Sequence, residues 1–308
     1  MLFHHHGYVS TNPRVQVAAG IGLDRPAELP DEMDVLIVGS GPAGMIAAAQ
    51  LAMFPDVHTR IIERRPHRLE IGQADGIQAR SVETFQAFGF ANEIIDEAFD
   101  LTSMAFWNPA EDDADTIVRT SLAEDDPEGV SEFPHLIVNQ ARILDWFAEY
   151  MKNSPTRARP DYGWAFETLE DTNDGEHPVL VTLRRTVDAQ GNALEDPASG
   201  PTRQVRAKYV VGADGAGSRV RKAIGHTLTG DAANHAWGVM DALADTDFPD
   251  IRTKCAIHSS SGSILLIPRE GGHLFRMYVD LGEVPADDNH QVRQTPLEEI
   301  IRRAQQIL

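Results

Sequence analysis

The stretch Asp34–Glu63 constrains this chain more than any other, because it changes from strand-like to helix-like pattern and back again. A run of branched apolar residues predicts a buried strand over 35–38, and an alanine-rich segment predicts a helix from Pro42 to about Met53. A second strand is predicted over 59–63. A strand, a turn, a helix and a strand of these lengths form a βαβ unit, which is typical of α/β folds.

Three glycines in the turn follow the G-x-G-x-x-G spacing of dinucleotide-binding loops. Gly39 permits a tight turn, Gly41 lets a pyrophosphate approach the backbone, and Gly44 lets the helix pack close to the strand. The N–H groups at the start of the helix favour a bound anion. Glu63, which ends the second strand, can accept hydrogen bonds from an adenosine ribose. The strand, the helix and the acidic residue around the glycines therefore favour a nucleotide-binding unit over a chance match to the glycine spacing.

A membrane span is the main alternative for this stretch, because residues 35–55 contain no charged side chain. The three glycines and Gln50 within it are unusual for a span, and acidic residues, among them Asp34, come directly before it. The same features exclude a signal peptide. The stretch is therefore interpreted as part of a globular domain, with no membrane partner.

Charge and cysteine content limit the partners of the chain. Its 308 residues carry 27 basic and 47 acidic side chains, a formal net charge of −20. A nucleic-acid partner is not expected, because phosphate binding needs a basic patch. The single cysteine, Cys255, excludes an intrachain disulfide framework and indicates a reducing, cytoplasmic environment. No metal site is predicted, and the composition is compatible with a homodimer.

The rest of the chain divides into regions of different pattern. Residues 1–30 lack a sustained period and are expected to form an N-terminal arm, which includes the run His4–His6. The acidic segment 108–132 predicts a solvated loop or hairpin. Strands are predicted over 179–184 and 204–211, and a β-rich region begins near residue 235.

The last predicted strand, in HLFRMYVDL, has two different faces. Period-two alternation puts Phe275, Met277 and Val279 on one face and Arg276 and Tyr278 on the other. An amphipathic helix is predicted at the end of the chain. Its apolar face is expected to contain Ile300, Ile301, Ala304 and Ile307.

Three features in this order resemble the single-component, FAD-dependent aromatic hydroxylases: GSGPAG, GADGAGSRVR and a late β-rich region. GQADGIQARSVETFQAFGF and LIPREGGHLFRMYVDLGEVP are similar to the branch that contains phenol 2-monooxygenase and 3-hydroxybenzoate 4-monooxygenase. The resemblance covers nearly the whole chain. It implies a Rossmann-like FAD-binding domain over 31–105 and 134–230, and an inserted β-sheet substrate domain over 106–133 and 231–308.

The resemblance also implies a set of FAD-binding residues. The glycine turn would face the pyrophosphate, Glu63 the adenosine ribose, and Asp214 of the Asp-Gly motif an FAD ribose. The implied set is Gly39, Gly41, Pro42, Ala43, Gly44, Glu63, Arg64, Gln73, Gln140, Arg142, Asp214 and Gly215. Asp214 and Gly215 also fit an ordinary turn. Gly217 stands where relatives commonly carry an arginine, a departure that affects a phosphate or nicotinamide contact.

For an aromatic substrate, the matching positions are Asp75, Lys254, Arg269 and Tyr278, with His135 as a further pocket candidate. The family hydroxylates a phenolic ring with O2 and NAD(P)H, through a flavin hydroperoxide. Tyr278 or Asp75 would bind the phenol hydroxyl, and one of them would act as general base. Lys254 or Arg269 would stabilise the phenolate or a ring carboxylate. A plain turn at Asp75 and a solvent-facing strand at Tyr278 would give the same pattern.

One feature departs from the family. Relatives have a second FAD motif, a Gly-Asp segment after the β-rich region, whereas here Gly230-Asp231 comes before that region and none follows Tyr278. We therefore expect the N-terminal half of a hydroxylase, which by itself binds FAD weakly or not at all. Two alternatives stay open: another flavoprotein of the same fold, such as an epoxidase or reductase, and a non-catalytic nucleotide-binding module.

Overall fold

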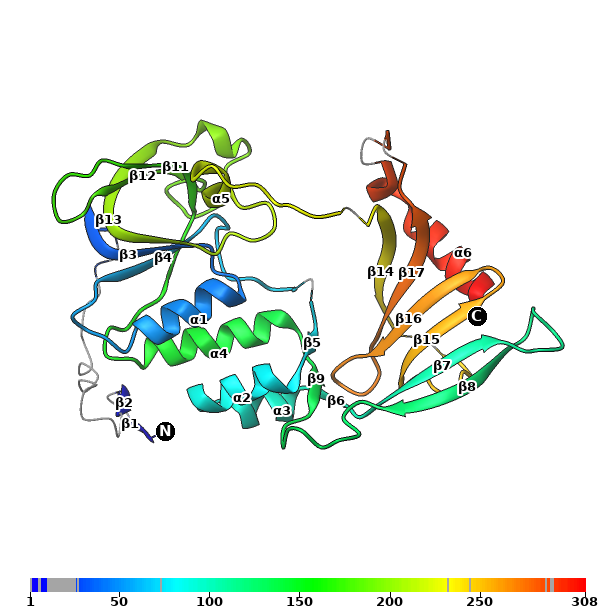
Figure 1. Ribbon diagram of the computed structural model, residues 1–308. Helices are drawn as coiled ribbons and strands as arrows, with labels where there is room; N and C mark the ends of the chain where they lie inside the picture. Colours follow the sequence, from blue (N-terminus) through cyan, green and yellow to red (C-terminus); the bar gives the residue numbers. More distant parts are fainter. Residues whose placement is uncertain are drawn as a thin grey trace. The chain divides into compact units, whose positions relative to one another are not determined.

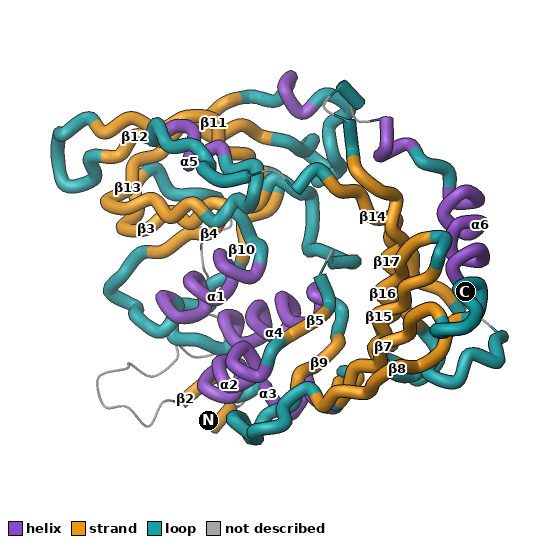
Figure 2. Tube along the Cα trace, turned by 45° about the vertical axis from the view of Figure 1, so that its right-hand side comes forward, coloured by secondary structure: helices purple, strands orange, loops and turns teal. Residues whose placement is uncertain are grey.

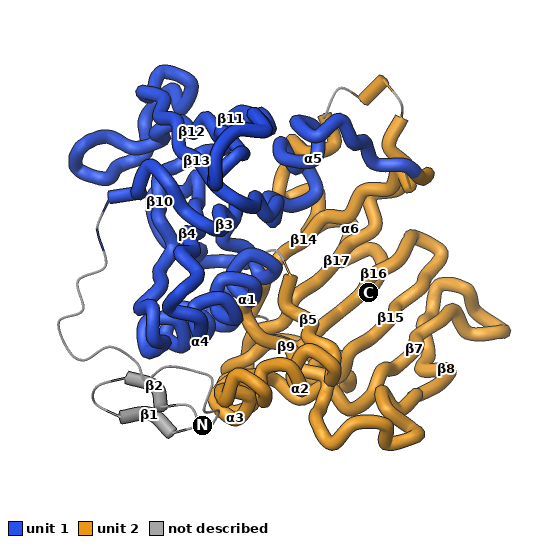
Figure 3. Tube along the Cα trace, turned by 60° about the vertical axis from the view of Figure 1, so that its left-hand side comes forward, with its two compact units in different colours: residues 1–73, 140–229 blue, residues 74–139, 230–308 orange. Residues whose placement is uncertain are grey.

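The computed structural model describes residues 2–4, 7–9, 26, 28–72, 74–231, 233–243, 245–285, 287–288 and 291–308. Gln73 and most of the predicted arm therefore lie outside the described residues. Within the arm, β1 (Leu2–His4) and β2 (Gly7–Val9) form an antiparallel pair. The chain forms two compact units, residues 1–73 with 140–229 and residues 74–139 with 230–308 (Figure 3).

The first unit is built on a six-stranded sheet in the order β10-β4-β3-β13-β12-β11 (Figure 1). The first four strands of this order are parallel neighbours, and the last two continue the sheet antiparallel. The strands are β3 (Glu32–Val38), β4 (Thr59–Glu63), β10 (Pro160–Tyr162), β11 (Trp164–Asp171), β12 (Val179–Arg185) and β13 (Thr202–Gly212). Helix α1 (Pro42–Leu51) connects β3 to β4, so the predicted βαβ unit is confirmed.

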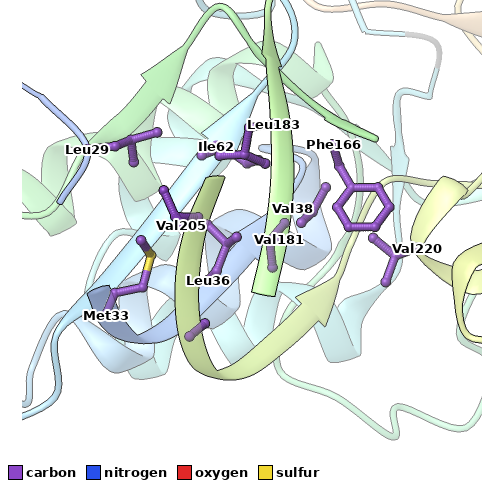
Figure 4. Packing of buried hydrophobic residues seen from close by; sticks show 11 residues of the cluster. Leu29, Met33, Leu36, Val38, Ile62, Phe166, Val181, Leu183, Val205 and Val220 are labelled. Carbon is purple, nitrogen blue, oxygen red and sulfur yellow. The ribbon is translucent and has the colours of Figure 1, made fainter. Parts of the chain in front are cut away.

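Apolar packing covers both faces of this sheet. Helix α1 packs against β3 and β4, and α4 (Gln140–Lys152) packs against α1. On the other face, Leu36 and Val38 of β3 pack with Val181, Leu183 and Phe166 in the cluster of Figure 4. Alternation along the strand explains the arrangement, because every second side chain of β3 points to the same face. The short helices of the unit are α5 (Arg219–Ala223) and the 3-10 helix η1 (Pro197–Ser199).

The second unit contains a six-stranded sheet in the order β14-β17-β16-β15-β7-β8, whose strands run side by side in Figure 2. These strands are β7 (Ser103–Pro109), β8 (Ile117–Glu124), β14 (His235–Ala242), β15 (Lys254–Ser259), β16 (Gly262–Pro268) and β17 (Phe275–Glu283). A three-stranded sheet consists of β5 (Gly76–Ile77), β9 (His135–Ile137) and β6 (Phe99–Leu101). The helices are α2 (Ala79–Phe88), α3 (Ala91–Glu97), η2 (Gln291–Gln294) and α6 (Leu297–Ile307).

The two faces of β17 have different surroundings, as the sequence predicts. Helix α6 lies along the large sheet (Figure 1), and its Ala304 and Ile307 share a core with Phe275, Met277 and Val279. The opposite face carries Arg276 and Tyr278, and there apolar side chains of β6, β9 and β16 form a smaller cluster with the tyrosine ring. Ile301 was predicted on the apolar face of the last helix but is 39% exposed, because the face that meets the sheet is narrower than predicted.

Several predicted elements take a definite place in these units. The acidic segment contains β8, which forms an antiparallel hairpin with β7, and β7 joins the large sheet through parallel pairing with β15. Residues 74–105 and 134–139, which the resemblance assigns to the FAD-binding domain, lie in the second unit. Strands β10, β11 and β15 were not predicted. In the described part of the chain, no helix is long and apolar enough to cross a bilayer.

Candidate functional site

The glycine turn of the first unit leaves space at one glycine and none at the other two. A Cβ atom on Gly39 would lie 2.5 Å from the backbone oxygen of Ala213, and the φ of Gly39 is +101°. A Cβ on Gly44 would lie 1.9 Å from the backbone oxygen of Gly39. A Cβ on Gly41, by contrast, would have no neighbour within 4 Å. The space beside Gly41 and the first turn of α1 is therefore open to a ligand.

Glu63 is buried beside this turn and accepts four hydrogen bonds. Its carboxylate accepts from the backbone N and Oγ of Ser40, and from the backbone N and Nη2 of Arg65, each at 3.0 Å. Burial by itself would raise the pKa of Glu63, but these donors outweigh burial and hold the pKa below its ordinary value. The residue is therefore an anion fixed against the glycine turn, with acceptor lone pairs for a ligand hydroxyl.

The Asp-Gly motif packs directly against the glycine turn, although residues 45–213 separate the two motifs in the sequence. The backbone N of Ala213 donates to Val38 O at 2.8 Å. The carboxylate of Asp214 accepts from Ser218 Oγ and from the backbone N of Arg219 (2.6 Å) and Val220 (3.2 Å), at the start of α5. Burial opposes the shift, but these hydrogen bonds keep the pKa of Asp214 low.

The other implied FAD-binding residues have varied surroundings. Gln140 begins α4 and packs so closely on Gly72 that a Cβ there would lie 2.2 Å from the Gln140 Cβ. The Arg142 guanidinium is largely exposed and pairs with Asp145 at 2.8 Å. Arg64 is exposed, and its backbone oxygen accepts from Thr186 Oγ1 at 2.7 Å.

In the second unit, Asp75 lies in a buried cluster of charged side chains. It comes directly before β5, is 4% exposed, and its backbone oxygen accepts from Val138 N at 2.9 Å. Its Oδ2 lies 3.2 Å from Arg276 Nη1 and 3.4 Å from Arg269 Nη1. Neither contact has hydrogen-bond geometry, so among the described residues Oδ2 has no hydrogen-bond partner. Burial raises the pKa of Asp75 and outweighs the two guanidiniums, which lower it.

Two further carboxylates pair with the arginines of this cluster. Asp241 accepts from Arg276 Nε (2.7 Å) and Nη2 (2.9 Å) and from Arg269 Nη1 (3.3 Å). Glu270 accepts from Arg269 Nε (2.9 Å) and Nη2 (2.8 Å). Both guanidiniums are almost fully buried, which makes these bidentate pairs stronger than exposed ones.

Tyr278, Lys254 and His135 have different relations to this cluster. Tyr278 shares a strand face with Arg276, and the hydrogen bonds of Arg276 to Asp241 raise the pKa of its guanidinium. Lys254 begins β15, and alternation from the buried Cys255 puts it on the same face of the sheet. The buried His135 lies 3.1 Å from Asp125 through Nδ1 and 3.4 Å from Gln78 through Nε2.

The cluster includes charged residues that are absent from the predicted set. Asp241 and Glu270 were not predicted, and Arg276 was assigned only to the polar face of its strand. The signal for Asp241 is its position between Met240 and Ala242, which face the α6 core. To predict that Asp241 belongs to the cluster, one would have to know that β14 pairs with β17, which puts Asp241 opposite Arg276. Among the described residues, no group of histidine, cysteine, aspartate or glutamate could hold a metal ion.

Comparison with known protein families gives one match over most of the chain. The family described as "FAD binding domain" matches residues 32–308. The 3-hydroxybenzoate 4-monooxygenase of Comamonas testosteroni is 45% identical over 100% of this chain and 47% of its own length. A phenol 2-monooxygenase of Aspergillus fumigatus is 29% identical over 90% of this chain and 44% of its own length. The chain therefore spans about half the length of these curated relatives.

A solved structure shows the same fold. The p-nitrophenol 4-monooxygenase of Pseudomonas putida superimposes with a TM-score of 0.69, covering 91% of this chain and 64% of that one. The two sequences are 18% identical, so this likeness shows the fold alone. The Rossmann-like sheet of one unit and the β-rich sheet of the other are thus shared with this monooxygenase.

Proposed function

Because this chain belongs to the FAD binding domain family, we propose that it provides the cofactor and substrate sites of a monooxygenase that hydroxylates a phenolic ring. The observation that carries the substrate class is the buried carboxylate of Asp75, which has an oxygen without a hydrogen-bond partner among the described residues. A buried acceptor of this kind fits a ligand hydroxyl. O2 and NAD(P)H are the proposed co-substrates.

The residues of the first unit fit FAD. The open space at Gly41 and the N–H groups at the start of α1 suit a pyrophosphate, and the buried anion of Glu63 suits a ribose hydroxyl. Asp214 lies in the motif next to the same turn, with its carboxylate ionised by hydrogen bonds. When bound, FAD supplies the electron transfer from NAD(P)H to O2 and the delivery of one oxygen atom to the ring.

The residues of the second unit would prepare the phenol for attack. A phenol hydroxyl that donates to Asp75 or Tyr278 gains phenolate character, which raises the electron density of the ring. The cation of Lys254 or Arg269 would stabilise a phenolate or a ring carboxylate. Arg276 shares a strand face with Tyr278 and would help to orient its side chain.

The substitution Tyr278→Phe tests this function, since it removes one hydroxyl and keeps the ring. In a preparation that turns over with FAD, NAD(P)H, O2 and 3-hydroxybenzoate or phenol, we expect the substitution to slow the formation of hydroxylated product about 100-fold, the usual effect of losing one acid–base group. Flavin fluorescence should show unchanged FAD binding.

Tyr209→Phe is the matched control, because Tyr209 lies in the first unit and is 68% exposed. This variant should retain the full rate. Equal rates for Tyr278→Phe and the unsubstituted chain would exclude the assigned role of Tyr278. Bound FAD without any phenol-dependent turnover or phenol binding would favour a non-catalytic nucleotide-binding module.

A further inference from the structure

The charged cluster around Asp75 has more anions than cations. It contains the carboxylates of Asp75, Asp241 and Glu270 and the guanidiniums of Arg269 and Arg276, so it carries one negative charge when all are ionised. The excess negative charge raises the proton affinity of the cluster, so one of its carboxylates becomes a stronger base. The hydrogen bonds decide which carboxylate this is.

The two arginines make short, bidentate hydrogen bonds to only two of the three carboxylates. Arg276 binds Asp241 through two donors, at 2.7 and 2.9 Å, and Arg269 binds Glu270 through two donors, at 2.9 and 2.8 Å. Asp75 receives only the long contacts of 3.2 and 3.4 Å, without hydrogen-bond geometry. Asp75 is therefore the carboxylate whose ionised form is least stabilised by hydrogen bonds.

We propose that Asp241 and Glu270 are positioning residues that occupy the two guanidiniums, so that Asp75 keeps one oxygen available to exchange a proton with a bound phenol. In that exchange the phenol O–H bond breaks, the proton moves to Asp75 Oδ2, and the electron pair stays on the phenolate oxygen. Asp75 has this role only if the proposed function holds. The charged groups that face it are Arg276 on β17, Asp241 on β14, and Arg269 and Glu270 in the turn after β16.

The proposal predicts opposite changes in the titration of Asp75 for two kinds of substitution. Asp241→Asn and Glu270→Gln each release a guanidinium, which can then pair with Asp75 and favour its ionised form. We expect the titration midpoint of Asp75 to fall by about 1 pH unit, the lower end of the effect of a new opposite charge. Arg276→Gln removes a cation, and the midpoint should rise.

The measurement is the side-chain carboxyl 13C shift of aspartate-labelled protein between pH 3 and pH 9, without flavin or substrate. The signal of Asp75 is the one that Asp75→Asn removes. Glu167→Gln is the matched control, because Glu167 also binds an arginine, Arg184, through two donors but lies in the first unit. It should leave the midpoint unchanged.

A merely structural role would lower the unfolding temperature of Asp241→Asn without moving the midpoint of Asp75, and that result would overturn the proposal. If Asp241→Asn does not fold, Glu270→Gln tests the proposal instead. Glu270 lies in a partly exposed turn, so its substitution should be tolerated by the fold. An unchanged or raised midpoint in Glu270→Gln contradicts the proposal. Because the titration needs neither cofactor nor phenol, its outcome is separate from a failure of the proposed function.

Discussion

At the scale of single residues, hydrogen bonds determine whether a carboxylate keeps its charge. Asp214 and Asp75 each come directly before a glycine. Burial opposes ionisation of Asp214, but three donors at the start of α5 outweigh it and lower the pKa. Burial raises the pKa of Asp75, whose Oδ2 has no such donor among the described residues. The first aspartate is therefore suited to a fixed contact and the second to proton exchange.

The lowered pKa of Asp214 predicts a pH-dependent contribution to stability. A carboxylate whose folded pKa lies below its ordinary value of 3.8 stabilises the fold above that value, and the contribution is lost as the pH falls through the folded pKa. We expect Asp214→Asn to lower the free energy of unfolding by about 1 kcal/mol at pH 7, the difference between hydrogen bonds to a charged and to a neutral acceptor. Urea unfolding at pH 7 and pH 3 checks this. An equal loss at both values would contradict it.

At the scale of elements, the turn between β3 and α1 contains two glycines that its packing requires and one that it does not. Gly39 and Gly44 cannot carry a side chain, because their neighbours are backbone atoms of the same unit. Gly41 has an ordinary φ of −72° and open space around its Cα. The fold of the chain therefore does not require a glycine at position 41.

Gly41→Ala and Gly44→Ala should accordingly give different results. Gly41→Ala should keep the thermal unfolding midpoint but weaken FAD binding, about tenfold for a clash of about 1.4 kcal/mol. Gly44→Ala should lower the midpoint, because the new methyl group would meet the Gly39 backbone at 1.9 Å. Differential scanning fluorimetry and flavin fluorescence measure the two effects. If the folded Gly41→Ala variant binds FAD with unchanged affinity, the pyrophosphate does not bind at this turn.

At the scale of the whole molecule, each unit has a core of its own. The cluster of Figure 4 belongs to the first unit, and the core under α6 belongs to the second. The first unit also contains a buried ion pair, in which Arg60 of β4 binds Asp161 of β10 at 2.7 and 2.8 Å. This pair joins the edge strand β10 to the sheet.

Asp161→Asn should destabilise the first unit by about 3 kcal/mol, because it leaves the buried charge of Arg60 without its anion. Hydrogen exchange followed by mass spectrometry should show lost protection in 28–72 and 140–229 and unchanged protection in 74–139 and 233–308. Asp145→Asn, which breaks the solvent-accessible pairs with Arg142 and Arg68, serves as control and should cost less than about 1 kcal/mol. Equal loss of protection in both units would show that they unfold together.

Local pattern was sufficient to predict the βαβ unit, the tight turn at Gly39, the close helix packing at Gly44, and the two faces of β17. These features depend on residues close in the sequence, whose period decides which side chains are buried. The sequence also pointed to Asp75, Arg269 and Tyr278 through a family resemblance, but not to their charge relations. Only the tertiary structure decided that Asp241 lies opposite Arg276, and that Arg60 meets Asp161. The physical reason is that strand order and register bring distant side chains together, and burial then determines which of them keep their charge.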